Sequence, residues 1–343
     1  MYILHRRTCL IALSVAVVSA SMAGALPRQQ PPSETAPSAV LHISVTDGYG
    51  RDIKGLQRAD FSISVDSIPA TISSFSAGDA PAAIGILLDV SGFMKEREPR
   101  FDALLKGLIQ FTEECNPTDR FFIIVMAAKP LLVTDWNQPG AALAAGIEEA
   151  GKASVKGKAF YDACDFAITK MNDTELSKKI LLVVSDGHDN SSKLNMAQLR
   201  KHLEESGIIL FSIAKTDAVI EHLSRFGRDI LEELSKVSGG EVYFPETSPE
   251  ALSSFNRVAG EIRHQYAIGI NAGNLKGDGK LHPVKARVNP QQPPAGAQGN
   301  RLRVLTRQYL FDAPRGGPAS LCKVTPRPIN LLRDVTAVVM TAP

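Results

Sequence analysis

This sequence has few cysteines, few histidines and a small net charge, and each of these features argues against a class of protein. Four cysteines among 343 residues do not make a disulfide framework, and their spacing is not that of a zinc site. The formal net charge of +2 gives no reason to expect a nucleic acid or an anionic surface as the partner. The seven histidines form no HExxH motif and no cluster, which disfavours a zinc hydrolase.

The cysteines that are present do not suggest chemistry. Cys9 lies in an N-terminal segment that we expect to be removed, which leaves Cys115, Cys164 and Cys322. Cys115 and Cys164 fall near apolar positions of expected helices. We interpret them as small buried hydrophobic residues rather than as a redox pair. The hydrophobic content of 44% and the charged content of 22% are typical of an ordinary globular protein.

Residues 1–25 have the layout of a secretory signal peptide. A basic segment at 5–7 precedes an apolar core at 9–18, and Ala23-Gly24-Ala25 offers a cleavage site. The core is shorter than the ~20 apolar residues that a spanning helix needs, which favours cleavage over an uncleaved membrane anchor. We therefore expect a secreted or periplasmic protein with no integral membrane segment after cleavage, and a flexible linker at residues 26–38.

Two apolar runs further along the chain end in carboxylates. The run at 83–88 is followed by Asp89 and, two residues later, by Ser91, and the run at 180–184 is followed by Ser185 and Asp186. Uninterrupted apolar runs of this length predict strands that are buried on both faces of a parallel sheet. Ligands of such sheets bind at the carboxyl ends of the strands. Two carboxylates and a hydroxyl at that edge are hard oxygen ligands suited to a divalent cation.

The rest of the chain surrounds these runs with a regular pattern. Residues 79–264 alternate between apolar runs and amphipathic helical patterns, which predicts an α/β fold with a doubly wound, mostly parallel sheet. A return segment at 131–134 is expected to form one antiparallel edge strand. Alternating patterns at 39–78 and 265–312 predict antiparallel strands, and we expect these flanks to pair into one small β module. Residues 313–343 show no clear period and are expected to form a tail.

Taken in order, these segments resemble a von Willebrand factor type A (VWA) domain, which has a Rossmann-like fold. The residues that carry the resemblance are 86–92, 119–121, 160–163 and 184–187. The flanks are similar to the secreted bacterial form of the family, with Asp60-Phe61 before the domain and Gln265-Tyr266 after it. The resemblance implies a function in adhesion or in complex assembly.

The resemblance also implies a metal-ion-dependent adhesion site, with an Asp-x-Ser-x-Ser motif, a Thr and a second Asp. In the family the ion is usually Mg²⁺, and a carboxylate of the partner completes its shell. Asp89 and Ser91 match the first two motif positions, and Asp186 matches the final Asp. The second Ser position is Phe93 and the Thr position is Lys158. Neither replacement supplies an oxygen, and a protonated lysine has no lone pair.

These replacements leave two interpretations of the site. If Lys158 points inward, its ammonium occupies the place of the ion and neutralises Asp89 and Asp186, which makes a metal-free site. If Lys158 points to solvent, a weakened Mg²⁺ site can form on Asp89, Ser91 and Asp186. The sequence favours the first interpretation, because an ammonium within a few ångströms of Mg²⁺ is strongly repelled. The expected cofactor is therefore none, or a weakly bound Mg²⁺.

Two further residues follow the second carboxylate. Asp189 is either an extra or water-mediated ligand or a turn residue that caps the following helix, and we favour the cap. His188 is either a metal ligand or base or a surface turn histidine, and we favour the latter because no nucleophile is placed near it by any motif.

The function that we predict is a secreted, non-enzymatic protein-interaction protein. The loops that carry Phe93, Lys158, His188 and Asp189 are expected to form the face that binds a protein partner, although Phe93 can instead fold inward as a filler. The alternatives are a Mg²⁺-dependent ligand-binding protein, a structural protein whose metal site has decayed, and a metal-assisted hydrolase. The hydrolase is the weakest of these, because no activated nucleophile is recognisable.

Overall fold

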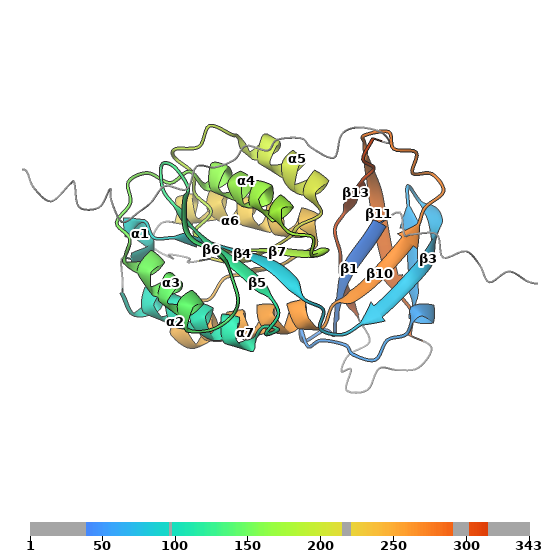
Figure 1. Ribbon diagram of the computed structural model, residues 1–343, viewed down its shortest axis with the longest axis horizontal. Coiled ribbons are helices and arrows are strands. Elements are labelled where there is room, and N and C mark those ends of the chain that lie inside the picture. Colours follow the sequence, from blue (N-terminus) through green and yellow to red (C-terminus); the bar gives the residue numbers. More distant parts are fainter. Residues whose placement is uncertain (1–38, 96–97, 215–220, 291–301, 315–343) are drawn as a thin grey trace, which may run out of the picture. The chain divides into compact units, whose positions relative to one another are not determined.

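The computed structural model describes residues 39–95, 98–214, 221–290 and 302–314, and the strands of these residues form two sheets (Figure 1). The predicted signal peptide at 1–25, the linker at 26–38 and all but the first two residues of the predicted tail lie outside the described residues. So do Cys9 and Cys322. No helix among the described residues is long and apolar enough to cross a membrane.

The first sheet has six strands in the order β6-β5-β4-β7-β8-β9. Its strands are β4 (Ala82–Asp89), β5 (Arg120–Met126), β6 (Leu131–Asn137), β7 (Lys178–Val184), β8 (Ile209–Ile213) and β9 (Val242–Tyr243). All neighbouring pairs are parallel except β5 with β6, which lies at the edge. The predicted α/β class and the mostly parallel sheet are thereby confirmed.

Helices cover both faces of this sheet (Figure 1). They are α1 (Gly92–Lys95), α2 (Glu98–Glu114), α3 (Ala141–Lys152), α4 (Phe160–Lys170), α5 (Met196–Ser206), α6 (Glu221–Ser238) and α7 (Ser248–Arg263). Apolar residues of α2, α3 and α7 pack on one face, and those of α4, α5 and α6 pack on the other. Because both faces are covered, every residue of β4 is buried, which explains its unbroken apolar sequence.

The second sheet is antiparallel and has the strand order β12-β1-β10-β3-β2-β11-β13. Its strands are β1 (Ala39–Thr46), β2 (Phe61–Val65), β3 (Ile68–Ala77), β10 (Tyr266–Asn271), β11 (Leu281–Val288), β12 (Arg303–Leu305) and β13 (Tyr309–Phe311). Two 3-10 turns, η1 (Arg58–Asp60) and η2 (Met171–Asp173), complete the elements. Since β10 lies between β1 and β3, the two flanks of the α/β region share one sheet, as the sequence predicted.

The two cysteines within the described residues are free and buried, as expected. Cys115 packs in the apolar core on one face of the parallel sheet, and Cys164 packs in the core on the other. Burial raises the pKa of both thiols, so neither is a ready nucleophile.

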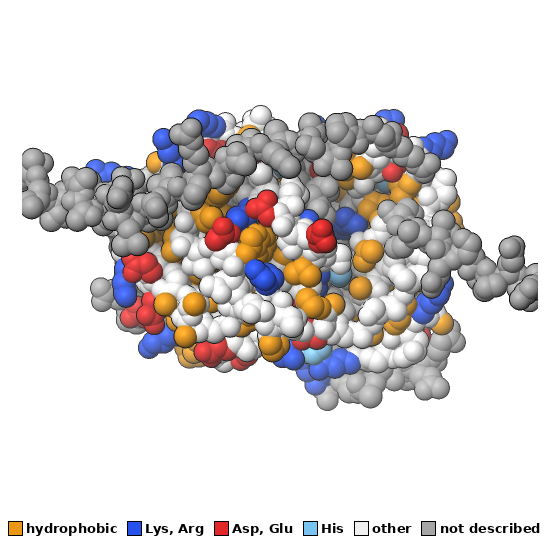
Figure 2. Space-filling view, viewed as in Figure 1, with side chains coloured by type: hydrophobic (Ala, Val, Ile, Leu, Met, Phe, Trp, Pro, Cys, Tyr) orange, Lys and Arg blue, Asp and Glu red, His pale blue; other side chains and the backbone are white. Residues whose placement is uncertain are grey.

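Acidic and basic side chains are intermixed over the face that Figure 2 shows, and no large patch of one sign is visible among its described residues. This distribution agrees with the small net charge of the chain. It gives the face no electrostatic feature of the kind that recruits nucleic acid.

Candidate site at the carboxyl edge of the parallel sheet

The two predicted carboxylates meet at one edge of the six-stranded sheet. Leu88 of β4 pairs in parallel with Val184 of β7, so the residues that follow each strand emerge side by side. The chain passes from β4 to β5 on one side and later returns to β7 on the other, which makes this border a switch point of the sheet. Asp89 is fully buried there, and Asp186 is 8% exposed.

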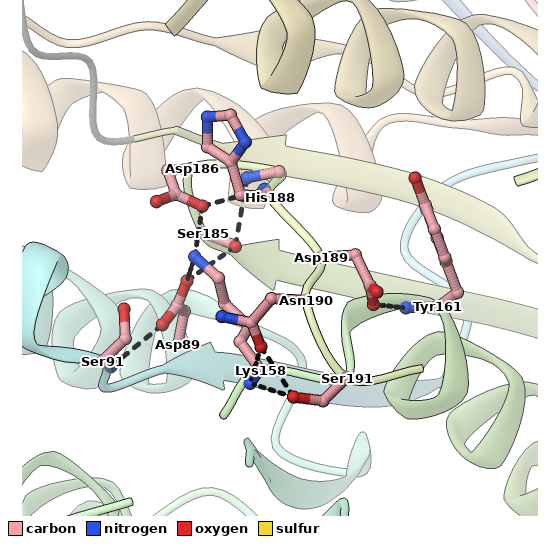
Figure 3. Close-up of polar contacts among 11 residues, drawn as sticks. Asp89, Ser91, Lys158, Tyr161, Ser185, Asp186, His188, Asp189, Asn190 and Ser191 are labelled. Carbon is pink, nitrogen blue, oxygen red and sulfur yellow. Dashed lines mark hydrogen bonds and ion pairs between the residues drawn. The ribbon is translucent and has the colours of Figure 1, made fainter. Parts of the chain in front are cut away.

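Lys158 reaches into this edge from the segment that precedes α4. Its Nζ lies 2.9 Å from Asp89 Oδ2 and 2.5 Å from Asp186 Oδ1, between the two carboxylates (Figure 3). The exposed fractions of the three side chains are 7%, 0% and 8%. The ammonium therefore bridges the two acids in a site that is nearly closed to solvent.

The backbone around Lys158 is held by the loop that follows Asp186. The Lys158 N–H donates to Asn190 Oδ1 at 2.7 Å and to Ser191 Oγ at 3.3 Å, and the Asn190 N–H donates to the Lys158 carbonyl at 2.9 Å. On the other side, the Ala159 N–H donates to the Ala127 carbonyl at 2.9 Å. These bonds fix where the lysine side chain begins, so its inward direction is supported by two loops.

The carboxylate oxygens accept further hydrogen bonds. Asp89 Oδ2 also accepts from Ser185 Oγ at 2.9 Å, and Asp89 Oδ1 accepts from the Ser91 N–H at 3.0 Å. Asp186 Oδ1 accepts from the His188 N–H at 2.9 Å. Three of the four oxygens are thus hydrogen-bonded within the site, and the fourth, Asp186 Oδ2, accepts no hydrogen bond from any residue that the structure describes.

The electrostatics of the site keep Lys158 charged. Burial alone would lower the pKa of its ammonium, but attraction by Asp89 and Asp186 and the hydrogen bonds to both outweigh burial, so the net effect raises the pKa. At neutral pH the lysine is therefore a fixed cation with no lone pair to offer as a nucleophile or as a ligand.

As placed, these residues do not fit a magnesium ion. Mg²⁺ requires about six oxygens in an octahedral shell. Here the Lys158 ammonium lies between Asp89 and Asp186, within 3 Å of an oxygen of each. A dication in the same space would face a positive charge and would lack the hydroxyl ligands that Phe93 and Lys158 replace.

The other predicted site residues have varied positions. Ser91 contacts Asp89 only through its N–H, and its buried Oγ has no hydrogen-bond partner among the described residues. The side chain of Phe93 lies outside the described residues. His188 is half-buried and contributes its N–H to Asp186, while its ring lies 6.5 Å from the ring of Phe226.

Asp189 lies near the site but organises the backbone instead. Its carboxylate accepts hydrogen bonds from the Tyr161 N–H at 3.3 Å, the Ser192 N–H at 3.2 Å and the Ser192 hydroxyl. Asp189 thereby caps α4, whereas the sequence predicted a cap on the following helix. The N-cap of that following helix, α5, is Asn195.

Four residues in or beside the site were not identified from the sequence. Ser185, Asn190 and Ser191 bind the acids or the lysine backbone, and Phe226 lies beside His188. The position of Ser185 directly before Asp186 was a usable signal, because a strand end brings both residues to the same edge. The Asn190 amide oxygen and the Ser191 hydroxyl accept from the Lys158 N–H, which is more than 30 positions away in the sequence. No local sequence pattern indicates such a contact.

A mostly parallel sheet covered on both faces, with a buried polar site at its switch point, defines an α/β domain of the Rossmann-like class. Within it, residues 84–188 match the family model described as the von Willebrand factor type A domain. The chain therefore contains a VWA domain. No curated protein matches the sequence at a significant level.

Solved structures match this chain at low identity and with TM-scores below 0.5. Proximal thread matrix protein 1 from the mussel byssus is 12% identical with a TM-score of 0.47, over 56% of this chain and 49% of that one, so the chain spans about half of its length. BatB from Bacteroides thetaiotaomicron is 17% identical with a TM-score of 0.43, over 52% and 98%. The vWF domain of the pilus tip protein Mfa5 from Porphyromonas gingivalis is 9% identical with a TM-score of 0.43, over 53% and 94%.

Proposed function

We propose that this chain is an extracytoplasmic, non-enzymatic protein-interaction protein whose VWA domain works without a metal ion. The observation that carries the proposal is the Lys158 ammonium, which lies between Asp89 and Asp186 and donates to an oxygen of each. A tethered cation in this position does what a bound ion does for the fold, because it brings together two buried acids that would otherwise repel each other.

The contacts of the site favour binding over catalysis. The only hydroxyl that touches the acids, among the described residues, is Ser185, and it donates to an Asp89 oxygen that is already paired with the Lys158 ammonium. The His188 ring makes no recorded hydrogen bond with a described residue, so no base is poised to activate a hydroxyl. The charged Lys158 has no free electron pair. An acid–base or nucleophilic mechanism is therefore not supported by these groups.

The proposal includes the organisation predicted from the sequence. A signal peptide at 1–25 directs the chain out of the cytoplasm, a linker follows at 26–38, and the VWA domain occupies 79–264 between two β segments at 39–78 and 265–312. The partner binds at the carboxyl edge of the parallel sheet, where Lys158, His188 and Asp189 belong to the surrounding loops and Phe93 belongs to α1.

Calorimetric titration with Mg²⁺, Mn²⁺ and Ca²⁺ tests the metal-free site. We expect no binding heat with residues 26–343 of the natural sequence. A Lys158→Thr variant, with Phe93→Ser added, restores two hydroxyls and removes the ammonium, and we expect it to bind Mg²⁺ measurably. Tight binding by the natural chain would instead support the metal-dependent alternative on Asp89, Ser91 and Asp186, which is favoured by a Ser91 Oγ that has no partner among the described residues.

A further inference from the structure

The buried site has an unbalanced charge. Asp89 and Asp186 carry two carboxylates, and Lys158 supplies one ammonium between them. The formal sum of these three groups is −1. A dication in the same place would bring the sum to zero and would itself attract an acidic group of a partner. Replacing the dication with a monocation therefore leaves the edge electronegative, and an acidic partner would add a second uncompensated negative charge.

One oxygen of the site has no donor among the described residues, and the Asp186 side chain that carries it keeps 8% of its surface exposed. Asp186 Oδ2 accepts no hydrogen bond from a described residue, whereas Asp186 Oδ1 binds the lysine and the His188 N–H. Figure 3 shows the second oxygen of Asp186 pointing away from the Lys158 ammonium. The hydroxyl of Ser91 is likewise without a partner among the described residues. A hydrogen-bond donor from outside would satisfy the carboxylate oxygen.

An exposed aromatic side chain lies beside His188, two residues after Asp186. Phe226 of α6 is 61% exposed, which is unusual for a large hydrophobic residue in the described part of the chain. Its ring is 6.5 Å from the ring of His188, whose N–H donates to Asp186. The next residue, Gly227, lies so close to the Asp186 carbonyl that a Cβ atom would collide with it. The helix turn that carries Phe226 is therefore pressed against the residue with the spare oxygen.

Arg228, two residues after Phe226 on the same helix, does not fill the site. Arg228 lies over the ring of Phe244, at 4.0 Å from the ring centroid, and it forms no recorded ion pair with Asp186. A spare carboxylate oxygen on one segment and an exposed aromatic ring on the helix packed against that segment suit a guanidinium, which donates to the oxygen and stacks on the ring.

We propose that this edge binds a basic side chain of a protein partner, most favourably an arginine, through Asp186 Oδ2 and the ring of Phe226. The proposal rests on the proposed function, since it requires Lys158 rather than a metal ion between the acids. It reverses the charge preference that the family resemblance implies. The chemistry of the partner follows from the formal charge of −1 at the site, because this charge attracts a cation and repels a carboxylate.

The test uses methylguanidinium chloride as a probe for an arginine side chain and sodium acetate as a probe for a carboxylate, both at constant ionic strength. Amide signals of the ¹⁵N-labelled chain are followed during each titration. We expect methylguanidinium to shift the Ser91 and His188 signals along a saturable curve, and acetate to leave them in place. Phe226→Ala should weaken the apparent affinity about two- to fivefold, the range expected of an exposed cation–π contact.

Two controls separate the outcomes. Tyr49→Ala removes another exposed aromatic residue, 72% exposed and outside the six-stranded sheet and its helices, and should leave the affinity unchanged. Mg²⁺ is titrated into the same sample: if Mg²⁺ shifts the Ser91 and His188 signals, the metal-free function fails and this inference fails with it. If neither Mg²⁺ nor methylguanidinium shifts them, or if acetate does, the metal-free site stands and the preference for a basic side chain is refuted.

Discussion

Replacing Lys158 with methionine removes the charge from the site and keeps most of the side-chain volume. Asp89 and Asp186 would then be left in a buried pocket without a cation, since the ammonium is the only basic group recorded in contact with either of them among the described residues. Removing one partner of a buried ion pair costs about 3–5 kcal/mol of folding free energy, because the remaining charge stays desolvated. We expect the Lys158→Met variant to lose an amount in this range at pH 7.

Lys170→Met is a matched control for that measurement. Lys158 and Lys170 have the same side-chain exposure, 7%, and both pair with two aspartates. The partners of Lys170 are Asp135 and Asp173, which are 67% and 61% exposed and stay hydrated when the ammonium is removed. Exposed pairs contribute about 1 kcal/mol or less, so this variant should lose much less stability than Lys158→Met.

Urea unfolding of both variants and the natural chain measures the difference. The loss in Lys158→Met should shrink as the pH falls, because protonation of one carboxylate relieves the repulsion between the two acids. If the removal of the ammonium lets the site bind Mg²⁺, the ion should restore part of the lost folding free energy. At about 100 times its Kd, this gain is about 2.7 kcal/mol. If Lys158→Met loses no more than Lys170→Met, the ammonium does not neutralise the acids and the metal-free site is wrong.

Three further changes have predictable effects on unfolding free energy. Burial raises the pKa of Glu261 from 4.5 to about 7, so stability should fall as pH rises through that window, and Glu261→Gln should flatten this slope in urea unfolding. Gly85→Ala places a Cβ against the Phe122 ring and should lower the unfolding free energy by about 1–3 kcal/mol. Thermal unfolding measures this loss, and an unchanged midpoint would contradict the expected collision. Ser185→Ala removes the donor to Asp89 and should cost about 1–3 kcal/mol.

The positions of the two acids could be predicted from the sequence, because parallel strands place their carboxyl ends at one edge. The direction of Lys158 could not. A lysine in a loop has no periodicity to indicate which way it points, and here its backbone is fixed by Asn190 and Ser191 from a distant loop. The sequence therefore led to two interpretations of the same residue, and tertiary contacts place its ammonium between the two acids.

The helix that carries Phe226 shows a second limit of the sequence pattern. The apolar spacing of the sequence indicates a helix only over residues 229–237, whereas α6 spans Glu221–Ser238. Glycine within a helix is unfavourable by about 1 kcal/mol, and Gly227 lies inside the part that was missed. The structure supplies the reason for the glycine, since its missing side chain lets the helix approach the Asp186 carbonyl. Such a close approach between elements is not visible in local propensity.

A cation that belongs to the chain differs from a bound metal ion in what controls it. A metal-dependent site fills according to ion concentration, and chelation empties it. In the proposed site, the Lys158 ammonium is placed by folding itself, through the bonds that Asn190 and Ser191 make to its backbone. Divalent ions and chelators should then leave the site unchanged. The same replacement halves the positive charge, so independence from metal and preference for a basic partner have one physical origin.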